Sequence, residues 1–422
     1  MDAATPAQSG WRGALFNRRM LICVFTGFSS GLPLYFLLTL VPAWLRSEHV
    51  DLAMIGLFAL IQFPYNWKFL WSPLVDRYAF PAFGRRRGWM LASQLALLAV
   101  LPAFGALDPA FDLWSIAFLS LAVAFFSATQ DIVLDAYRRE LLLEAELGLG
   151  NSIHVNAYRI AGLVPGSLSL VLADHMPWGG VFFVTALFML PGMAMALLVA
   201  EPPAGDRPRT LRDAVLAPFR EFIHRAGLRS ALLVLAFLVL YKLGDSMAVA
   251  LATPFYLDMG FTKSEIGLIA KNAGLWPSVI GGLAGGIWML KLGINRALWL
   301  FGVVQVVAIL GFALLTAFPH DRLMLALVIG FEALGVGLGT AAFVAFIARA
   351  SHPAYTATQF ALFTSLSAVP RVIANSFTGW IVERTGWFDF FLLCTLLAVP
   401  GMLLLPWIAP WRGDGEKPAG GP

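Results

Sequence analysis

The class of this protein is decided by its first long apolar run, Met20-Leu-Ile-Cys-Val-Phe-Thr-Gly-Phe-Ser-Ser-Gly-Leu-Pro-Leu-Tyr-Phe-Leu-Leu-Thr-Leu-Val-Pro-Ala-Trp-Leu45. The run holds no charged residue and is longer than the roughly 20 apolar residues that a helix needs to cross a bilayer. A strand of a transmembrane barrel would instead alternate polar and apolar residues over about 10 positions. Because a helix satisfies its own backbone hydrogen bonds in lipid, we expect an all-α membrane protein.

The rest of the chain repeats this pattern. Hydrophobic residues make up 59% of the 422 residues and charged residues 13%, and the mean hydropathy is +0.77. A soluble core of this size cannot bury so much apolar surface, so the chain needs lipid as its solvent. Apolar runs separated by charge, Pro and Gly predict twelve spans, near 20–45, 52–72, 89–107, 113–136, 152–173, 178–200, 230–256, 265–289, 296–317, 322–348, 357–382 and 386–409.

The basic residues between the spans are distributed unevenly. If the N-terminus is cytoplasmic, the loops on the opposite side hold only Arg46, Lys263, Arg322 and Arg384 among the 29 Lys and Arg residues of the chain. This asymmetry predicts a multi-pass inner-membrane protein with both termini in the cytoplasm. It also accounts for the basic charge without a nucleic-acid partner, which would require a basic soluble domain.

The longest loop separates two groups of six spans. It holds apolar residues on one helical face and arginines elsewhere, which predicts an amphipathic helix on the cytoplasmic leaflet; an ordinary solvated linker is the alternative. The predicted organisation is an N-terminal tail at 1–19, a six-helix bundle at 20–200, the linker at 201–229, a second six-helix bundle at 230–409 and a C-terminal tail at 410–422.

The two halves share features at an offset near 210 residues. Trp178 is followed by Pro191-Gly192-Met193 as Trp387 is followed by Pro400-Gly401-Met402, and Pro42 with Ile55-Gly56-Leu57 matches Pro254 with Ile266-Gly267-Leu268. Two parallel six-helix repeats around a cavity form the major facilitator architecture. The predicted fold is therefore twelve transmembrane helices in two pseudo-symmetric six-helix bundles.

The loop between spans 2 and 3 resembles the signature loop of that superfamily. Its residues are Asp76 and Arg77 followed by Gly84, Arg85, Arg86 and Arg87. Asp76 can pair with an arginine or accept from a helix N-terminus, which would latch the cytoplasmic ends of the helices in one state. Ser72 stands where the pattern has its leading Gly, and the second half keeps only an echo without an acidic residue, so only the first latch has its full charge set.

Several charged residues fall inside the spans, where each costs roughly 2.5–3.5 kcal/mol and needs a partner, water or a function. Asp131 and Asp135 lie four apart on one face of the fourth span. They are either a carboxyl pair that carries a proton, or a gate pair neutralised by Arg159 of the fifth span.

A second set of polar residues lies deeper in the spans. Lys242 and Asp245 lie three apart on the seventh span and can neutralise each other, and protonation of Asp245 would release Lys242. The internal excess of cationic groups suggests an anionic substrate. The residues that we expect to contact it are Lys242, Lys271, Arg371, Gln130, Tyr35, Gln359 and Asn272, and the expected proton carriers are Asp131, Asp245 and Asp135.

The sequence holds no pattern typical of an enzyme. It contains no metal-ligand cluster, no phosphate-binding loop of the G-x-x-x-x-G-K type and no nucleotide-binding domain. We therefore expect a transporter without metal or cofactor, driven by a gradient and working as a monomer in the lipid bilayer.

Several stretches together resemble one bacterial family, the AmpG-type muropeptide permeases. They begin at Gly27-Phe-Ser-Ser-Gly-Leu-Pro33 and include Lys68-Phe-Leu-Trp-Ser-Pro-Leu-Val-Asp-Arg77, Ser127-Ala-Thr-Gln-Asp-Ile-Val-Leu-Asp135, Tyr241-Lys-Leu-Gly-Asp245 and Ala357-Thr-Gln-Phe-Ala-Leu362. The resemblance implies proton-driven import of N-acetylglucosaminyl-1,6-anhydro-N-acetylmuramic acid, with or without its peptide, from periplasm to cytoplasm. It also implies a role in peptidoglycan recycling and an influence on β-lactam resistance.

Two other functions remain open at this point. One is a facilitator of another anionic or amphiphilic substrate, such as a siderophore or an acyl-coenzyme A ester. The other is a membrane scaffold or receptor that transports nothing.

Overall fold

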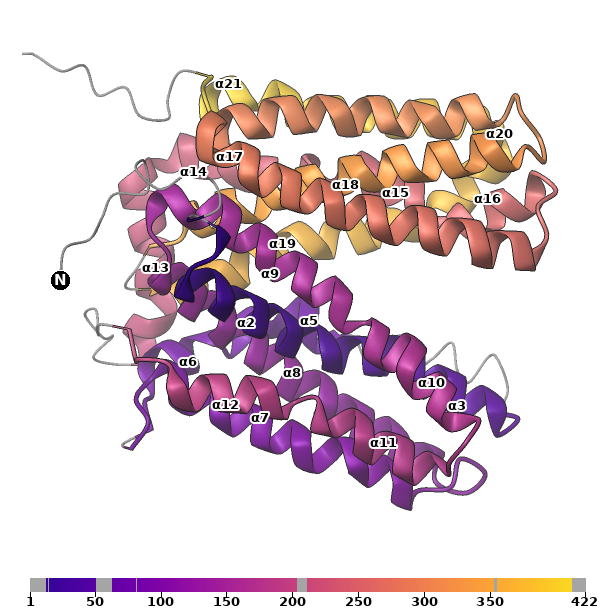
Figure 1. Cartoon of the computed structure of the whole chain (residues 1–422). Helices are drawn as coiled ribbons and strands as arrows, with labels where there is room; N and C mark the ends of the chain where they lie inside the picture. The colour runs from indigo at the N-terminus through magenta and orange to yellow at the C-terminus, as the bar shows by residue number, and fades with distance from the viewer. Residues whose placement is uncertain are drawn as a thin grey trace, which may run out of the picture.

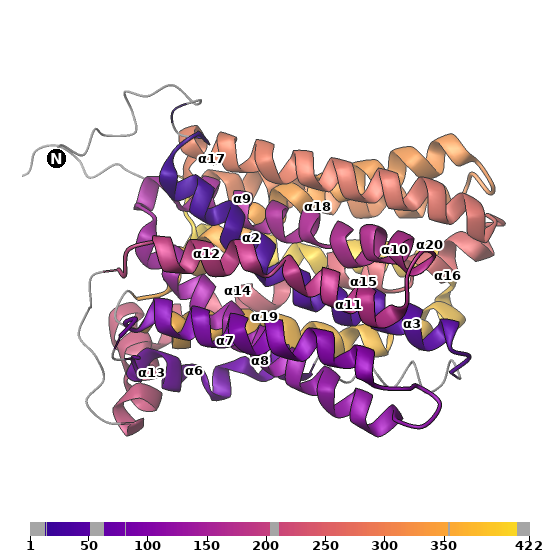
Figure 2. The same ribbon diagram turned by 60° about the horizontal axis from the view of Figure 1, so that its bottom comes forward.

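The computed structural model describes residues 13, 15–50, 63–80, 82–202, 211–352 and 355–411. They form a bundle of long helices that run roughly parallel to one another (Figures 1 and 2). Ile55-Gly56-Leu57, most of the two predicted tails and residues 203–210 of the predicted linker lie outside this part of the chain.

The N-terminal half contains six helical segments. In order they are α2 (Arg18–Tyr35) continued by η1 (Phe36–Leu40) and α3 (Val41–Ser47); α5 (Phe63–Trp67), η3 (Lys68–Leu70) and α6 (Ser72–Arg77); α7 (Arg86–Ala103) with η4 (Phe104–Ala106); α8 (Leu113–Leu141); η5 (Glu144–Glu146), α9 (Leu147–Ala161), η6 (Val164–Leu168) and α10 (Ser169–Ala173); and α11 (Trp178–Leu187) with α12 (Leu190–Leu198).

The C-terminal half follows the linker helix α13 (Leu211–Ala226). Its elements are α14 (Leu228–Leu240), α15 (Leu243–Ala250), α16 (Ala252–Asp258), α17 (Lys263–Leu315), α18 (Arg322–Ala350), α19 (Thr356–Ser376), α20 (Thr378–Leu403) and α21 (Leu405–Ile408). Two of these helices contain a reversal of the chain, because Gly293 in α17 and Gly386 in α20 have positive φ angles of 74° and 78°. Such φ and ψ values are open to glycine and strained for other residues.

Divided at these two glycines, the helices of the described ranges match the expected spans, the second of them only from Phe63 onward. Within the described ranges, nine helices are long and apolar enough to cross a membrane. Three spans account for the difference. The two arms of α17 count there as one helix, the second span falls partly on residues 51–62, and α19 is rich in Thr, Ser, Gln and Asn.

Aromatic clusters confirm that the two halves are related. Phe36, Phe104 and Phe182 pack together in the first half, with ring centroids 5.2–5.8 Å apart. Phe255, Phe312 and Phe391 form the matching cluster in the second half, at 4.8–6.3 Å. The offsets are 219, 208 and 209 residues. The predicted equivalents Trp178 and Trp387 each stack on the third member of their own cluster.

The fourth and fifth helices extend further than expected. Helix α8 ends at Leu141 instead of near 136, and α9 begins at Leu147 instead of near 152. The sequence prediction ended the span at the charged residues, but these have partners within α8 and on neighbouring segments. Arg138 binds Asp135 at 2.8 Å and donates from Nε to the Asn151 side-chain oxygen at 2.7 Å.

The predicted linker helix is present as α13, and it packs against protein. The Phe222 ring lies 5.0 Å from the Phe363 ring of α19, and Gln359 of α19 donates to the Pro218 carbonyl oxygen. Phe219 and Ile223 are the exposed apolar residues that would face the cytoplasmic leaflet.

Helices α2 and α9 approach each other closely because glycine lies at their contact. A Cβ atom built on Gly27 would lie 2.1 Å from the His154 carbonyl oxygen, and one on Gly31 would lie 2.2 Å from that of Tyr158. Small residues at a helix crossing are typical of membrane bundles, because they let two backbones touch.

We expect Gly31→Ala to lower the melting temperature of the detergent-solubilised protein. The added methyl group must push α2 away from α9, and overpacking of this kind costs about 1–3 kcal/mol. The matched control is Gly379→Ala, where a Cβ atom meets nothing within 4 Å. This control should melt at or slightly above the wild-type temperature, because Ala favours a helix over Gly. Equal melting of the two variants would contradict the packing argument.

Candidate functional site

One end of the molecule carries α13, α21 and the start of α2, and we call it the linker end (Figure 1). Asp76 joins the two halves there. Its Oδ1 accepts from the Arg86 guanidinium at 2.9 Å, while Oδ2 accepts from the backbone N–H of Thr358 at 2.9 Å and from its hydroxyl at 2.8 Å. Thr358 lies in the first turn of α19, where N–H groups have no partner within the helix. The signature loop thus uses both kinds of contact that the sequence suggested for Asp76.

The arginines of the signature loop are held by two further carboxylates. Arg85 and Arg86 both bind Glu140 at the end of α8, at 3.2 and 2.5 Å. Glu201 accepts from the backbone N–H groups of Arg85, Arg86 and Arg87 at 2.7–2.9 Å, which places an anion at the N-terminus of α7.

Gly84 is required at this turn by its conformation and by its neighbour. Its φ angle is +82°, and a Cβ atom would lie 2.7 Å from the Glu201 carboxyl carbon. Arg87 donates to the carbonyl oxygens of Ala196 and Leu197, and the Arg77 guanidinium lies 5.3 Å from the Tyr78 ring.

A second contact between the halves runs along α9 and the first arm of α17, and we call it the seam. Its members follow α9 at intervals of three or four residues. Gly148 packs on Met289, the Ser152 hydroxyl donates to the Gly282 carbonyl oxygen, and Asn156 packs on Gly282. The last member is Arg159, whose Nη1 donates to the Ser278 carbonyl oxygen at 3.1 Å. Beyond it the ribbons of the two halves diverge (Figure 1).

The carboxylates of α8 are neutralised by a lysine of the second span. Lys68 Nζ lies 3.6 Å from Asp131 and 3.7 Å from Asp135, and its side chain is only 8% exposed. The Ser30 hydroxyl donates to Asp131 at 2.5 Å, and Arg138 completes the group at Asp135. Of the two alternatives for Asp131 and Asp135, neutralisation by Arg159 is not seen, because the cations that bind them are Lys68 of the second span and Arg138 one helix turn along α8.

The deeper charged residues converge from both halves. Lys242 and Asp245 form the expected ion pair at 3.2 Å. Arg371 and Arg159 lie close enough to Asp245 to interact with its charge, and Glu332 of α18 is a neighbour of the same groups. We call the five residues Arg159, Lys242, Asp245, Glu332 and Arg371 the central charge group. It holds three cationic side chains and two carboxyl groups.

The other residues predicted to contact substrate are placed differently. Tyr35 is half-buried beside Tyr158, at a centroid distance of 5.6 Å. Gln130 is fully buried, so it is inaccessible in this conformation. Asn272 is exposed on α17; Lys271 adjoins it, with a side chain outside what the structure describes.

Gln359 does not lie with the central charge group, contrary to its prediction as a substrate contact. Its amide is occupied at the linker end, where it accepts from the His352 N–H and donates to Glu221 at 2.7 Å, so it holds the linker helix instead of lining the centre. Its side chain is 1% exposed. The sequence placed it too deep because α19 begins at Thr356 and Gln359 lies in its first turn.

We call the contacts of Asp76, Arg85 and Arg86 the latch, and the pairs of Asp131 and Asp135 the α8 group. The sequence analysis did not identify four of their partners: Glu140, Glu201, Thr358 and Arg138. Glu140, Glu201 and Arg138 follow predicted spans and Thr358 lies in the first turn of one, where a charged or polar residue needs no explanation. Only the meeting of distant segments gives them a partner.

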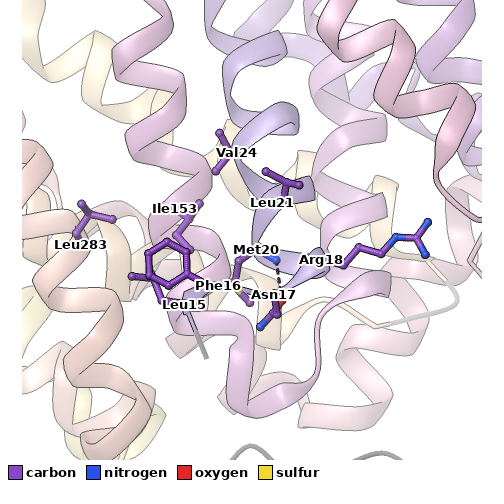
Figure 3. A pocket seen from close by; sticks show the side chains of 9 residues that line it. All are labelled: Leu15, Phe16, Asn17, Arg18, Met20, Leu21, Val24, Ile153 and Leu283. Atoms are coloured by element: carbon purple, nitrogen blue, oxygen red, sulfur yellow. Dashed lines mark hydrogen bonds between the residues drawn. The ribbon is translucent and has the colours of Figure 1, made fainter. Parts of the chain in front are cut away.

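An apolar cavity of about 590 Å³ lies at the linker end, and it is not the candidate site (Figure 3). Met20, Leu21 and Val24 of α2 face Ile153 and Leu283 across it, and Arg18 is its charged lining residue. None of the residues predicted to contact substrate lines it.

We expect Thr358→Val to weaken the latch and open the linker end more often. Loss of a hydrogen bond to a charged acceptor costs about 1.5–3 kcal/mol, which is about tenfold or more in an equilibrium. The measurement is maleimide labelling of Ala361→Cys, a buried position on α19, with Cys23 and Cys394 replaced by Ala. Thr364→Val is the matched control, because this hydroxyl bonds only within its own helix. Equal labelling rates would argue against the latch.

We expect Lys68→Met to destabilise the protein, because it leaves Asp131 and Asp135 buried with one cation instead of two. Removal of one partner from a buried ion pair costs about 3–5 kcal/mol. Asp131→Asn in the same chain should restore neutrality and recover part of the lost melting temperature. A double variant that melts no higher than Lys68→Met would disprove the charge balance of this group.

Comparison with known proteins places this architecture in a family. A model of the Major Facilitator Superfamily matches residues 23–375. The anhydromuropeptide permease of Escherichia coli is 43% identical over 390 residues, which cover 92% of this chain and 79% of that protein. A putative transporter of Rickettsia felis, AmpG 4, is 31% identical over 92% of this chain and 96% of its own length.

Two further matches extend the comparison. An uncharacterized protein of Haemophilus influenzae is 53% identical, covering 96% of this chain and 97% of that protein. The crystal structure of the human organic anion transporter MFSD10 superposes with a TM-score of 0.70 over 94% of this chain and all of that one, at 16% identity, which shows a shared fold. This chain is therefore a membrane transporter, not an enzyme, and it belongs to the AmpG-type permeases of the major facilitator superfamily.

Proposed function

We propose that this protein imports anhydromuropeptides from the periplasm to the cytoplasm together with protons, for peptidoglycan recycling. The substrate would be N-acetylglucosaminyl-1,6-anhydro-N-acetylmuramic acid, with or without its peptide. The observation that carries the proposal is the 43% identity to the Escherichia coli anhydromuropeptide permease over 92% of this chain.

The chemistry of the central charge group supports an anionic substrate. Muropeptides carry lactyl and peptide carboxylates, and three cations face two carboxyl groups where the halves converge. Lys242 and Arg371 would receive anionic groups, with Lys271 and Asn272 of α17 as further polar contacts. Tyr35 offers an aromatic plane for the apolar face of a sugar ring.

Proton coupling is assigned to the carboxylates that are paired with a lysine. Asp245 holds Lys242 at 3.2 Å, so protonation of Asp245 would break this ion pair and free Lys242 for the substrate. Asp131 and Asp135 share Lys68 in the same way and would carry a proton on the N-terminal side. In each case, proton binding would change the net charge of the side chains around the substrate. This change would couple proton movement to substrate transport.

Alternating access fits the placement of the contacts between the halves. The latch and the seam close the linker end, which the distribution of basic residues assigns to the cytoplasm. In this conformation the protein would receive substrate from the periplasm and would release it after both contacts open. A single chain contains both halves, so we assign the monomer as the working unit in the bacterial inner membrane.

We expect Asp245→Asn to abolish uptake of labelled anhydromuropeptide into proteoliposomes with an imposed pH gradient, while exchange by counterflow continues. The neutral side chain can no longer gain or lose a proton, but the binding site stays in place. Asp174→Asn, a substitution of an exposed aspartate, is the matched control and should transport normally.

The same assay separates the competing functions. A transporter of another anionic or amphiphilic substrate would ignore this sugar, and a scaffold would move nothing. Full gradient-driven uptake by Asp245→Asn would overturn the role of Asp245 while leaving the substrate assignment intact.

A further inference from the structure

Arg159 occupies the point where the closed seam ends. The three preceding members of the seam, at Gly148, Ser152 and Asn156, pack against α17 through small or uncharged groups. Arg159 is the only charged residue among the four, and along α9 it is the last of them. Towards α10 and α16 the ribbons of the two halves diverge (Figure 1). Its partner is the carbonyl oxygen of Ser278, a neutral acceptor on the other half of the protein.

The guanidinium of Arg159 makes few polar contacts with the rest of the described chain. Among the ion pairs of the described chain, none includes Arg159, although the side chain is half-buried. An arginine side chain has five N–H donors in a planar fork that matches a carboxylate, and a single carbonyl oxygen occupies one of them at 3.1 Å. A carboxylate would bind this fork more strongly than the carbonyl does, because both partners would then be charged.

The surroundings of Arg159 suit a glycan that carries a carboxylate. Tyr158 precedes it, and the half-buried ring of Tyr35 lies 5.6 Å from the Tyr158 ring. Gly162, one turn further along α9, leaves room for the Tyr35 ring, which would lie 2.9 Å from a Cβ atom there. An aromatic plane and a cation with free donors therefore face the same region, next to Asp245 and Glu332 of the other half.

The backbone of both helices departs from an α-helix just beyond Tyr35 and Arg159. A π-helical turn begins at Phe36, directly after Tyr35, and a second one begins at Val164, directly after Leu163. Such turns are frequent at functional sites, because they shift the side chains that follow out of the regular helical register. Here the two turns pack against each other, and each begins within five residues after Tyr35 or Arg159.

We propose that Arg159 receives a carboxylate of the transported substrate, and that its guanidinium leaves the Ser278 carbonyl oxygen when it does so. Binding of the substrate then removes the last contact of the seam. The inference rests on the proposed function, since it assumes an anionic glycan as cargo. It moves Arg159 from the gate, where the sequence analysis placed it, to the junction of gate and binding site.

The arrangement gives a physical link between binding and opening. A ligand shifts a conformational equilibrium only by the difference between its affinities for the two states. A carboxylate that competes with Ser278 for Arg159 binds better to the state in which the seam is open. The substrate would therefore favour release of the linker end, and a neutral analogue would not.

The test compares the anhydro-disaccharide that bears a free carboxylate with the same molecule as its carboxamide. Counterflow in proteoliposomes is measured for wild type, Arg159→Gln, Arg159→Lys and the control Arg46→Gln, which removes an exposed arginine at the far end of the first span. Wild type and Arg46→Gln should prefer the acid by about tenfold or more in KM. Arg159→Gln should lose this preference, and Arg159→Lys should keep part of it.

A second readout follows the seam itself. Ser278 is only 7% exposed in the structure. In the variant Ser278→Cys, the rate of labelling by a water-soluble maleimide would therefore report opening beside Arg159. With Cys23 and Cys394 replaced by Ala, the acid should speed labelling severalfold and the amide should not. In Arg159→Gln, labelling should already be fast without substrate and should no longer respond to the acid.

The outcomes separate this inference from the proposed function. If wild type moves neither compound, the proposed function fails and the inference falls with it. If wild type moves both and Arg159→Gln keeps the preference for the acid, the function stands and the role of Arg159 is overturned. A lost preference with unchanged labelling would also overturn the link between binding and the seam.

Discussion

The cost of a charge in the interior of a membrane protein governs this structure. In the N-terminal half, ion pairs offset this cost, because Lys68 and Arg138 neutralise Asp131 and Asp135. The region where the halves converge does not reach neutrality in the same way, because Arg159, Lys242 and Arg371 face Asp245 and Glu332. Excess positive charge is tolerable where water and an anionic substrate have access, and this is why we propose the region as the binding site.

Closure of the linker end depends on contacts that are individually weak. Asp76 accepts from the first turn of α19, and the seam uses carbonyl oxygens of α17 as acceptors. Carbonyl acceptors and orphan N–H groups can exchange partners with water at small cost, so the halves can separate without leaving a buried charge unpaired. The strong ion pairs of Arg86 with Asp76 and Glu140 lie within one half, and they survive the separation.

Both charged groups contain a carboxylate paired with a lysine. Lys68 with Asp131 and Asp135 lies in the N-terminal half, and Lys242 with Asp245 lies in the C-terminal half. Tyr158 is close to Asp131 and to Tyr35. Under the proposed function, a proton or a substrate that changes the charge of either group would alter the field at the contact between the halves.

The sequence by itself determined the class, the expected spans and the repeat. Hydrophobic periodicity and the offset near 210 residues are local or self-similar signals, and the clusters around Phe104 and Phe312 agree with them. The pair Lys242–Asp245 was also predictable, because three residues along a helix fix two side chains on one face. Only the tertiary structure decided that Lys68 neutralises Asp131, that Gln359 holds the linker and that Arg159 ends the seam. These contacts join segments up to 282 residues apart, as Asp76 and Thr358 show, and the distance between such segments is set by helix packing that no local pattern encodes.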